Sequence, residues 1–445
     1  MKVNELEISG WGRLPRATAR VVRPERLTAA VEAVKARPEG GLVARGGGRS
    51  YGDAALNDGG HVLLTRRLDR ILAFDREEAQ LVSEPGVTIA ELQSFLVPLG
   101  FTLPAVPGTG FATLGGAVAN DVHGKNHDRH GSLGDHLQWF DLLTADGAFR
   151  RVSAADEPDL FAATIGGIGL TGILMTICVS VLPCPSNAVR VTEMRADDLD
   201  HFLTLLAQHR DRETYSVGWI DTLARGARFG RGILEVAEPS ERPVEARPPR
   251  SLRVPMDMPG FVLNRWSISA MNAWYYSRVP SFGRDRVVPL ETFFHPLDSV
   301  LDWNRMYGRA GFRQFQCVIP DDRAPVGIRC LLEAVTESRA GSFLAVLKTM
   351  GGEGRGHLSF PMRGFTLALD FPARAGLDAL MGQLEAITLE HGGRVYLAKD
   401  SCLSPEGFAR MYPKLPELRQ TLDRVDPDRL FVSDMARRLD IRGEL

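Results

Sequence analysis

Short apolar runs separated by glycine, proline and other turn residues make up most of the first 185 residues, and this pattern predicts strands. The expected strands are residues 19–22, 41–44, 61–64, 80–83, 137–143 and 149–152, with a turn at 145–147 that joins the last two as a hairpin.

Two segments of this region have helical signals instead. Pro24 is placed to open a helix over residues 25–35. Thr88 and Glu91 have the spacing of a capping box for a helix that ends near Gly100. Another short helix is expected after Ser153.

Residues 160–183 carry no charge and are long enough to span a bilayer. Four glycines interrupt the centre of this segment, however, and residues 172–182 are rich in β-branched side chains. These features favour a glycine-rich loop followed by a buried strand over a membrane helix.

The pattern changes near Ser186, where glycine becomes rarer and aromatic residues more common. Residues 238–259, which include the run RPPR at 247–250, collect prolines and charges and predict a long loop. Residues 343–399 predict strands around a helix. Further helices are expected from Pro405 and near Leu415.

The length of the chain, 445 residues, exceeds the size at which one hydrophobic core usually stops growing. We therefore expect an α+β protein of two domains, the first comprising residues 1–185 completed by 400–445 and the second residues 186–399. The composition, 44% hydrophobic and 24% charged, is that of an ordinary globular protein. A net charge of −2 gives no broad positive surface, so no nucleic-acid partner is expected.

The five cysteines show no CxxC pair and no spacing typical of a metal finger. They predict buried free thiols and no structural metal site. Residues 1–16 lack the apolar core of a secretory signal, so a cytoplasmic protein is expected.

Two glycine-rich stretches predict a ligand site. The strand at 41–44 runs into Gly46, Gly47 and Gly48, which would leave several backbone N–H groups free to hold a phosphate. By itself such a loop is equally typical of a surface hairpin. A Rossmann site is not predicted, because neither the expected helix nor an acidic residue about 20 positions on follows.

The second stretch, residues 104–134, holds seven glycines and three histidines and is too irregular for one helix or strand. Glycine permits positive φ and close approach of the backbone to a ligand. The insert DVHGKNH places an imidazole and an ammonium beside that ligand, as a cofactor site requires.

These motifs resemble the FAD-binding domain of the vanillyl-alcohol oxidase/p-cresol methylhydroxylase (PCMH) flavoproteins. The matching segments are ARGGGRSYGDAA, PGTGFATLGGAVANDVHGKNH and GGIGLTG. Within that superfamily the rest of the chain resembles the decaprenylphosphoryl-β-D-ribose 2′-oxidase family, through FFHPLDSVLDWNRMYG, RQFQCVIP, VLKTMG, HLSFPMRGFTLALDFP, YLAKDS and FVSDMARRL.

The resemblance implies a two-domain PCMH-type fold, with a substrate domain built on an antiparallel sheet flanked by helices. It also implies FAD-dependent oxidation of the 2′-hydroxyl of a polyprenyl-phosphoryl-β-D-ribose to a ketone, which an NADH-dependent short-chain reductase then reduces to the arabinose epimer. Other branches of the superfamily bond FAD covalently through a histidine in the first glycine loop. That loop here holds only glycines and an arginine, so non-covalent FAD is expected.

The resemblance also implies site residues. His123, Lys125 and Lys399 are the expected catalytic residues, and His123 and Lys399 are also expected to contact the cofactor. The other expected cofactor-binding residues are Arg45, Gly46, Gly47, Gly48, Arg49, Ser50, Tyr51, Pro107, Gly108, Thr109, Gly115, Gly116, Asp121, Gly124, Gly169 and Gly172.

The expected substrate-binding residues are Trp219, Phe294, Leu297, Gln314, Gln316, Lys348 and Thr366. Thr366 and Ala368 depart from the family pattern, which has an amide-bearing residue and a thiol there, so the sugar and the lipid length stay open.

Two alternatives remain. One is a flavin oxidase acting on a soluble alditol or aldonolactone, and the other is a non-catalytic flavoprotein that binds the lipid-linked sugar and the reductase. A polyprenyl substrate also requires access from a membrane, so we expect peripheral contact at the inner membrane face through the apolar run at 256–263.

Overall fold

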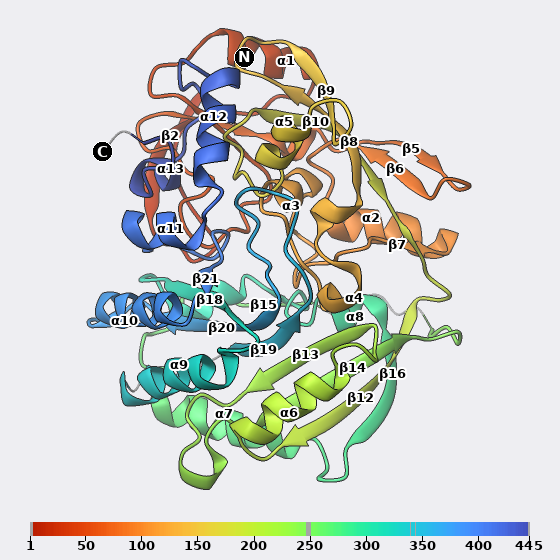
Figure 1. Ribbon diagram of the computed structural model, residues 1–445, viewed down its shortest axis with the longest axis vertical. Coiled ribbons are helices and arrows are strands. Elements are labelled where there is room, and N and C mark those ends of the chain that lie inside the picture. Colours follow the sequence, from red (N-terminus) through yellow and green to blue (C-terminus); the bar gives the residue numbers. More distant parts are fainter. Residues whose placement is uncertain (1–2, 246–250, 339, 343, 444–445) are drawn as a thin grey trace.

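The computed structural model, in which residues 3–245, 251–338, 340–342 and 344–443 are described, consists of two parts (Figure 1). The upper part contains the N-terminal segments and the C-terminal helices. The lower part is an antiparallel sheet with helices packed against it. The expected α+β mixture is therefore present.

The first small sheet has the strand order β1-β2-β4-β3 and packs against α1 (Leu27–Lys35). Its strands are β1 (Asn4–Ser9), β2 (Arg16–Val22), β3 (Leu42–Arg45) and β4 (His61–Leu64). The alternation of Leu6 and Ile8 with polar residues is a very short signal for β1, and most of its side chains stay exposed. Pairing of its backbone with β2 holds this strand instead.

The second sheet has the order β5-β6-β10-β8-β9. Its strands are β5 (Ile71–Asp75), β6 (Gln80–Ser83), β8 (Leu137–Leu143), β9 (Phe149–Ser153) and β10 (Ile173–Ser180). The predicted hairpin is β8 with β9. The predicted glycine-rich loop is the turn that follows α5 (Pro158–Thr164). The predicted buried strand is β10, which lies at the centre of the sheet. None of the described helices is long and apolar enough to cross a membrane.

The glycine-rich segment 104–134 contains two short helices, α3 (Leu114–Ala119) and α4 (His127–His130). Thr113 caps α3 by accepting a hydrogen bond from the Gly116 N–H. The predicted capping box of Thr88 and Glu91 is present at α2 (Ile89–Leu96). A small ladder of β7 (Phe101–Thr102) with β11 (Leu182–Pro183) follows α2.

The eight-stranded sheet has the order β16-β12-β14-β13-β19-β20-β18-β21, and every pairing in it is antiparallel. Its strands are β12 (Ala188–Ala196), β13 (Tyr215–Ile220), β14 (Gly232–Pro239), β16 (Arg284–Pro289), β18 (Phe312–Pro320), β19 (Ala345–Met350), β20 (Gly364–Pro372) and β21 (Arg394–Val395).

One face of this sheet is covered by α6 (Leu199–His209), α9 (Ala324–Ser338) and α10 (Leu377–Glu390). Leu347, Leu367 and Leu369 point into that core. Because neighbouring residues of a strand face opposite sides, the residues between them point to the other face, toward the glycine-rich segments.

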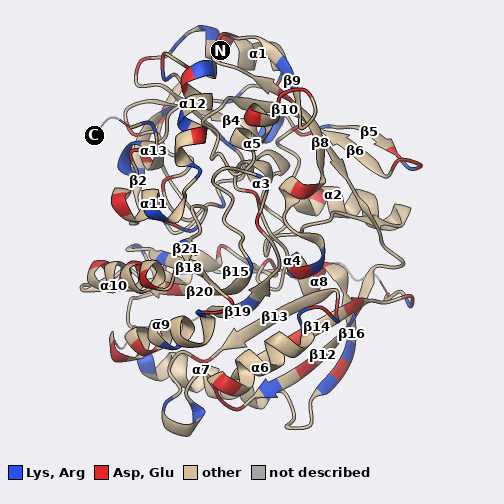
Figure 2. Cartoon of the chain, viewed as in Figure 1, with Lys and Arg blue, Asp and Glu red and all other residues tan. Residues whose placement is uncertain are grey.

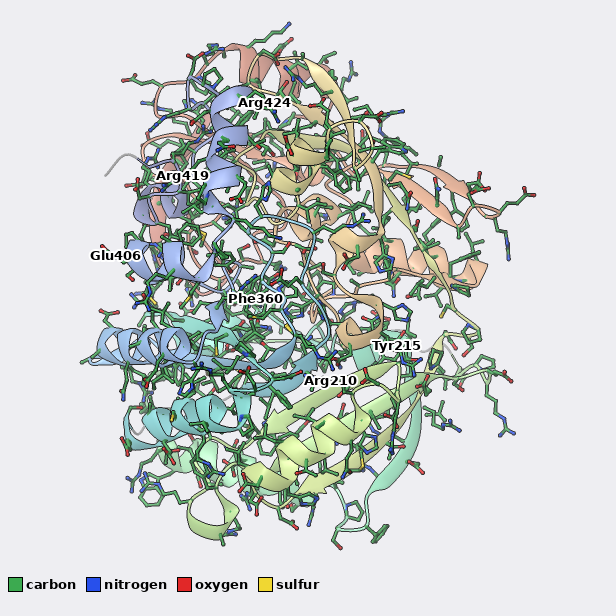
Figure 3. The ribbon with its side chains drawn as sticks, in the orientation of Figure 1. Arg210, Tyr215, Phe360, Glu406, Arg419 and Arg424 are labelled. Atoms are coloured by element: carbon green, nitrogen blue, oxygen red, sulfur yellow. The ribbon has the colours of Figure 1, made fainter. Side chains whose placement is uncertain are left out.

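A buried ion pair joins the two parts of the molecule. Arg210, at the end of α6, lies near α4 (Figure 3), and its Nε is 3.3 Å from an Asp128 carboxylate oxygen. The other oxygen of Asp128 accepts the Thr349 hydroxyl of β19. These contacts hold the segment that follows His123 against the sheet.

The C-terminal helices pack against the first part of the chain. They are α11 (Pro405–Met411), α12 (Leu415–Val425) and α13 (Asp434–Arg438). The guanidinium of Arg438 makes two hydrogen bonds to Asp53, at 2.8 and 2.9 Å, and one to Asp400 at 2.8 Å. It thereby joins the loop after Tyr51 to the residue after Lys399.

Arg438→Met should lower the free energy of unfolding by about 2–3 kcal/mol, because both carboxylates are buried and would lose their cation. Urea denaturation monitored by circular dichroism would measure this change. The matched variant Arg424→Met, on α12, removes an exposed pair with Asp159 of α5 and should lower the free energy of unfolding by less than about 0.5 kcal/mol. Equal costs for the two variants would contradict the expectation.

The predicted loop 238–259 begins inside β14, which extends to Pro239, and its RPPR run lies outside the described residues. Beyond that run, β15 (Leu252–Arg253) pairs with β17 (Val300–Leu301), and α7 (Arg265–Ser277) and α8 (Leu290–Phe294) flank the large sheet. The division into residues 1–185 with 400–445 and 186–399 stays a prediction.

Candidate active site

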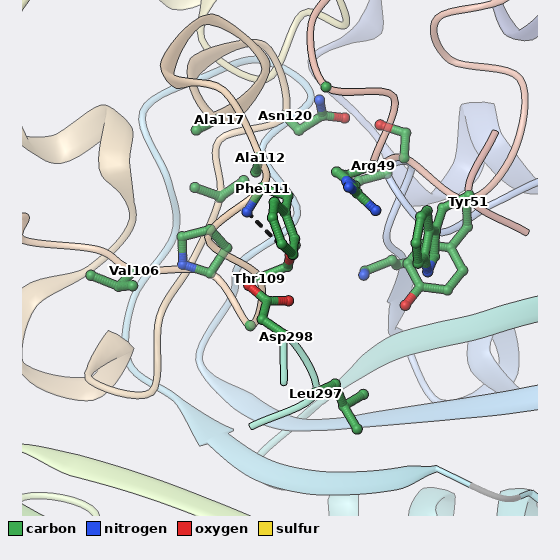
Figure 4. A pocket seen from close by; sticks show the side chains of 18 of the residues that line it. Arg49, Tyr51, Val106, Thr109, Phe111, Ala112, Ala117, Asn120, Leu297 and Asp298 are labelled. Atoms are coloured by element: carbon green, nitrogen blue, oxygen red, sulfur yellow. Dashed lines mark hydrogen bonds between the residues drawn. The ribbon is translucent and has the colours of Figure 1, made fainter. Parts of the chain in front are cut away.

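One cavity of about 1030 Å³ lies between the glycine-rich segments and the free face of the eight-stranded sheet. Figure 4 shows part of its lining, with Arg49 and Tyr51 on one side, Thr109 and Phe111 on the other, and Leu297 below. All the predicted site residues line this cavity except Arg45 and Asp121.

The first glycine loop offers a row of backbone donors. Within the part of the chain that the structure describes, the N–H groups of residues 46–50 donate no hydrogen bond. A Cβ on Gly46 would lie 2.1 Å from the Thr113 hydroxyl, and a Cβ on Gly47 would lie 2.5 Å from the Phe111 carbonyl oxygen. Glycine is therefore needed to bring this loop against the second glycine-rich segment, where its free N–H groups suit a pyrophosphate.

The second segment supplies open space as well as close packing. A Cβ on Gly108 or Gly169 would meet no protein atom within 4 Å, although both residues line the cavity. Gly115 and Gly172 are glycine for another reason, because a Cβ there would clash with Pro85 or Leu143. The cavity thus has unfilled volume beside the backbone, and an extended planar cofactor fits it.

Arg45 and Asp121 support the site from behind. The Arg45 guanidinium donates to the carbonyl oxygens of Ser9, at 2.7 Å, and Ala55, at 3.3 Å. The buried Asp121 carboxylate accepts the Gly134 N–H and the Ser359 hydroxyl. Both residues fix the loops rather than face the cavity.

Arg49 faces the cavity with its guanidinium above two aromatic rings, 4.1 Å from the Trp11 centroid and 4.8 Å from that of Phe111. Asp298 accepts the Gly110 N–H at 2.7 Å and holds the next loop in place. Sequence reasoning missed Asp298, since an aspartate in an irregular segment is usually a turn residue.

The sheet contributes its side chains through strict alternation. Gln314 and Gln316 on β18, Thr366 and Ala368 on β20, and Lys348 on β19 all lie on the cavity face. The predicted substrate residues on these strands therefore share one surface. Two residues after Ala368 on the same strand, Asp370 points to the same face. The sequence analysis did not predict Asp370 as a site residue.

His123 stands where the glycine-rich segment meets this surface. Lys348 Nζ donates to His123 Nδ1 at 2.9 Å, and the Gln316 amide lies 3.2 Å from Nε2. Because Nδ1 accepts a hydrogen bond from Lys348, the hydrogen of the neutral ring belongs on Nε2. With its amide rotated by half a turn, Gln316 accepts the hydrogen bond from Nε2 through its carbonyl oxygen. Burial, together with the charge of Lys348, holds the pKa of His123 well below its usual value, so the ring is neutral at pH 7.

Lys399 forms a second buried group with Asp370. Its ammonium lies 4.0 Å from the Tyr51 ring centroid. Asp370 accepts a short hydrogen bond from the Gln314 amide. Burial lowers the pKa of Lys399, which Asp370 partly restores, and burial raises the pKa of Asp370. An ammonium thus lies against an aromatic ring, and the charge of one carboxylate, Asp370, acts on its pKa.

Lys125 points away from His123. Its ammonium donates to the Phe293 carbonyl oxygen and lies 4.0 Å above the Phe293 ring. Burial lowers the pKa of Lys125 to about 8. The residue in contact with His123 is therefore Lys348, although the sequence motif pairs His123 with Lys125.

Apolar residues line the cavity between these groups and its far end. Trp219 of β13 packs edge-on against Tyr275 of α7, with ring centroids 4.8 Å apart. Phe294 and Leu297 come from α8 and the turn after it. The predicted apolar residues therefore all belong to the cavity lining.

Comparison with known proteins identifies the same regions. Residues 15–153 match the model of an FAD binding domain, and residues 367–439 match that of D-arabinono-1,4-lactone oxidase. The chain is 36% identical to decaprenylphosphoryl-beta-D-ribose oxidase of Mycolicibacterium smegmatis over 98% of its own length and 97% of that protein.

Two further relatives are similar over less of the chain. An uncharacterised protein of Streptomyces coelicolor is 37% identical over 80% of this chain and 100% of its own length. L-gulonolactone oxidase of Mus musculus is 28% identical over 31% of each chain. The fold is thus the two-domain α+β fold of PCMH-type flavoproteins, and the chain belongs to the FAD-binding family that includes decaprenylphosphoryl-beta-D-ribose oxidase.

Proposed function

We propose that this protein oxidises the 2′-hydroxyl of a polyprenyl-phosphoryl-β-D-ribose to a ketone, using FAD. The observation that carries this proposal is the hydrogen bond between His123 and Lys348, with Lys399 and Asp370 on the same sheet face and a glycine loop with free N–H groups beside them. The similarity to a decaprenylphosphoryl-beta-D-ribose oxidase over nearly the whole chain supports the choice of substrate.

The cofactor would be held without a covalent bond. The free N–H groups of residues 46–50 would receive its pyrophosphate, and the open space beside Gly108 and Gly169 would receive its flat rings. When bound, FAD supplies a two-electron acceptor for the hydride that leaves the sugar carbon.

The protein groups would handle charge and the proton. The Lys399 ammonium would stabilise the negative charge that hydride transfer places on the cofactor. The unprotonated pair of His123 and Lys348 would accept the hydroxyl proton, while Gln316 and Thr366, which share a hydrogen bond at 3.2 Å, would position the sugar.

This role predicts a pH dependence. Burial lowers the pKa of Lys348 to about 7, partly opposed by Asp128. Below that pH the ammonium forms and the pair loses its capacity to accept a proton. We expect kcat/KM for flavin reduction to fall about tenfold per pH unit below 7 and to level off above it.

Anaerobic stopped-flow measurements across this pH range would give the profile. In Lys348→Met the fall in kcat/KM below pH 7 should disappear. Lys414→Met, at the exposed lysine that precedes α12, should leave the profile unchanged. A flat profile in the unmodified protein would exclude the proposed proton acceptor.

The function itself is tested by the anaerobic visible spectrum of the purified protein. A flavin band that denaturation releases, and that a polyprenyl-phosphoryl ribose bleaches while ribitol and ribonolactone do not, is the expected result. Bleaching by the soluble sugars alone would favour an alditol or aldonolactone oxidase, the alternative that the match to D-arabinono-1,4-lactone oxidase keeps open. A bound flavin that no sugar bleaches would favour a non-catalytic binding protein.

We also propose two partners. A 2′-ketone is an intermediate between the ribose and arabinose forms, so an NADH-dependent short-chain reductase would consume the product. The lipid tail requires contact with the inner face of the membrane from the cytoplasmic side. Analytical size exclusion of the protein mixed with such a reductase would test the first of these partners, and unchanged elution volumes would contradict a stable complex.

The exposed aromatic residues near α7 support membrane contact. Phe261, Trp266 and Trp274 are 76%, 71% and 66% exposed, while Met271 and Tyr275 on the same helix line the cavity. A tail leaving the cavity past these residues would enter the membrane interface, where tryptophan is favoured.

Co-sedimentation with phospholipid vesicles would test this contact. Combined Trp266→Ser and Trp274→Ser changes should abolish binding, whereas Phe149→Ser, on an exposed aromatic residue of β9, should not. Equal binding by all three proteins would refute it.

A further inference from the structure

A cluster of arginines lines the cavity at the edge of the sheet away from His123. Arg286 belongs to β16, Arg278 follows α7, and both reach Glu235 of β14. Figure 2 shows basic and acidic segments side by side on β12 and β16. None of these residues was expected at the site, because each by itself is typical of an exposed strand or helix end.

The cluster is held rigidly from below by Glu193 of β12, whose side chain is fully buried. Its carboxylate contacts Arg278 Nη1 at 2.7 Å, Arg284 Nη2 at 2.5 Å and Arg286 Nε at 3.2 Å. The Tyr275 hydroxyl fixes Arg278 from the side at 2.9 Å. The guanidinium groups are thus ordered before any ligand arrives.

The cavity end carries more positive than negative charge. Arg278, Arg286 and Lys125 line it together with a single carboxylate, that of Glu235. Lys125 lies close enough to Glu235 and Arg286 for their charges to act on its pKa. The Nε atom of Arg278 is buried and donates no hydrogen bond within the described residues, whereas Arg286 Nε lies against the Glu193 carboxylate.

The distance from the reacting groups suits one segment of a lipid-linked sugar. Lys348 is on β19, and Glu235 is on β14, two strands away across β13. Neighbouring strands are about 4.8 Å apart, so the backbones at Lys348 and Glu235 are separated by roughly 10 Å. The backbone of Arg286 lies two strands farther on, and its side chain reaches back to Glu235, with Nη2 3.4 Å from the carboxylate. A ribose held by Gln316 and Lys348 would extend its anomeric substituent across Trp219 toward the arginines.

We propose that Arg278 and Arg286, with Lys125, form the subsite for the phosphodiester of the substrate, and that the prenyl chain leaves over α7. Arginine suits this role because its planar group donates two parallel hydrogen bonds to phosphate oxygens. This inference rests on the proposed function and adds the residues that distinguish a phosphorylated lipid sugar from a free sugar.

The test uses the FAD-loaded protein and two probes, farnesyl phosphate and farnesol, with binding followed by calorimetry. In Arg278→Gln and Arg286→Gln, Kd for farnesyl phosphate should rise about 10- to 100-fold, as loss of a charged hydrogen bond predicts, and Kd for farnesol should not change. Arg284→Gln is the matched control. It also contacts Glu193 from β16 but lies outside the cavity lining formed by the described residues, and Kd should stay within about twofold.

Reduction by farnesylphosphoryl ribose separates this inference from the proposed function. In the two cavity variants KM should rise while kcat is retained, since a phosphate held equally in ground and transition states affects binding alone. Flavin content and melting temperature of each variant report on folding, and Arg286→Lys should recover part of the affinity.

Unchanged Kd for farnesyl phosphate, or an equal loss for farnesol, would overturn the subsite. If the unmodified protein is not reduced by farnesylphosphoryl ribose but binds farnesyl phosphate through these arginines, the proposed function fails and the subsite stands. Reduction without any arginine dependence would leave the proposed function intact and refute the subsite.

Discussion

Lys399→Met should lower the rate of flavin reduction by substrate about 10²- to 10³-fold while the protein keeps its FAD. The ammonium is buried beside Tyr51 and Asp370, and a preorganised charge in such a site has an effect of this size on the transition state. Methionine keeps most of the volume and removes the charge. Single-turnover measurements under anaerobic conditions report the step directly.

The exposed Lys414 provides the control for this change. Lys414→Met removes an equal charge at the surface, where the Glu353 carboxylate is 3.9 Å away, and should leave the rate within about twofold. A Lys399→Met protein that is reduced at the normal rate would refute the role assigned to the ammonium. Loss of bound flavin in Lys399→Met would instead place Lys399 among the residues that hold the cofactor.

Gly46→Val should give a folded protein that purifies with little or no FAD. Any Cβ at this position overlaps the Thr113 hydroxyl, and valine adds two further methyl groups. Either the first glycine loop or the start of α3 must then move, and both line the cavity. Overpacking of this kind costs about 1–3 kcal/mol or more, which corresponds to a loss of affinity of roughly 100-fold at the upper value.

The ratio of flavin to protein absorbance measures this loss, and titration with added FAD gives the remaining affinity. Gly382→Ala is the comparison, because a Cβ there meets no atom within 4 Å in the middle of α10. That variant should retain full flavin and be slightly more stable, since alanine favours the helix. A Gly46→Val protein with a normal flavin content would show that the loop tolerates displacement.

The charged groups of the site come from both parts of the molecule. His123 comes from the glycine-rich segment, while its partner Lys348 comes from the large sheet. Tyr51 follows the first glycine loop, while Asp370, beside Lys399, comes from β20. Changes at the boundary, such as loss of the Arg210 pair with Asp128, should therefore act on the chemistry as well as on stability.

Local patterns in the sequence were sufficient for the elements near the site. The capping box at Thr88, the hairpin of β8 and β9 and the buried strand β10 follow from propensity and period over a few residues, and all three are present. The glycine loops were recognisable because close contacts require glycine there, with the Thr113 side chain at Gly46 and with the Phe111 backbone at Gly47. The strand β1 was not predicted, because its only apolar residues, Leu6 and Ile8, are too short a pattern for a strand that stays mostly exposed.

The sequence alone was enough to identify the glycine-rich cofactor loops. The two-residue spacing of Gln314 and Gln316 was also enough to place both amides on one face of a strand. The folded chain was needed to learn which charges meet. Lys125 is two residues from His123 in the chain, yet it is Lys348, 225 residues away, that donates to the imidazole. Glu193, Glu235 and Arg286 likewise converge through the register of three strands, and Arg278 joins them from the end of α7. Such contacts depend on sheet order and on the direction of long side chains, and the spacing of residues along a chain contains neither.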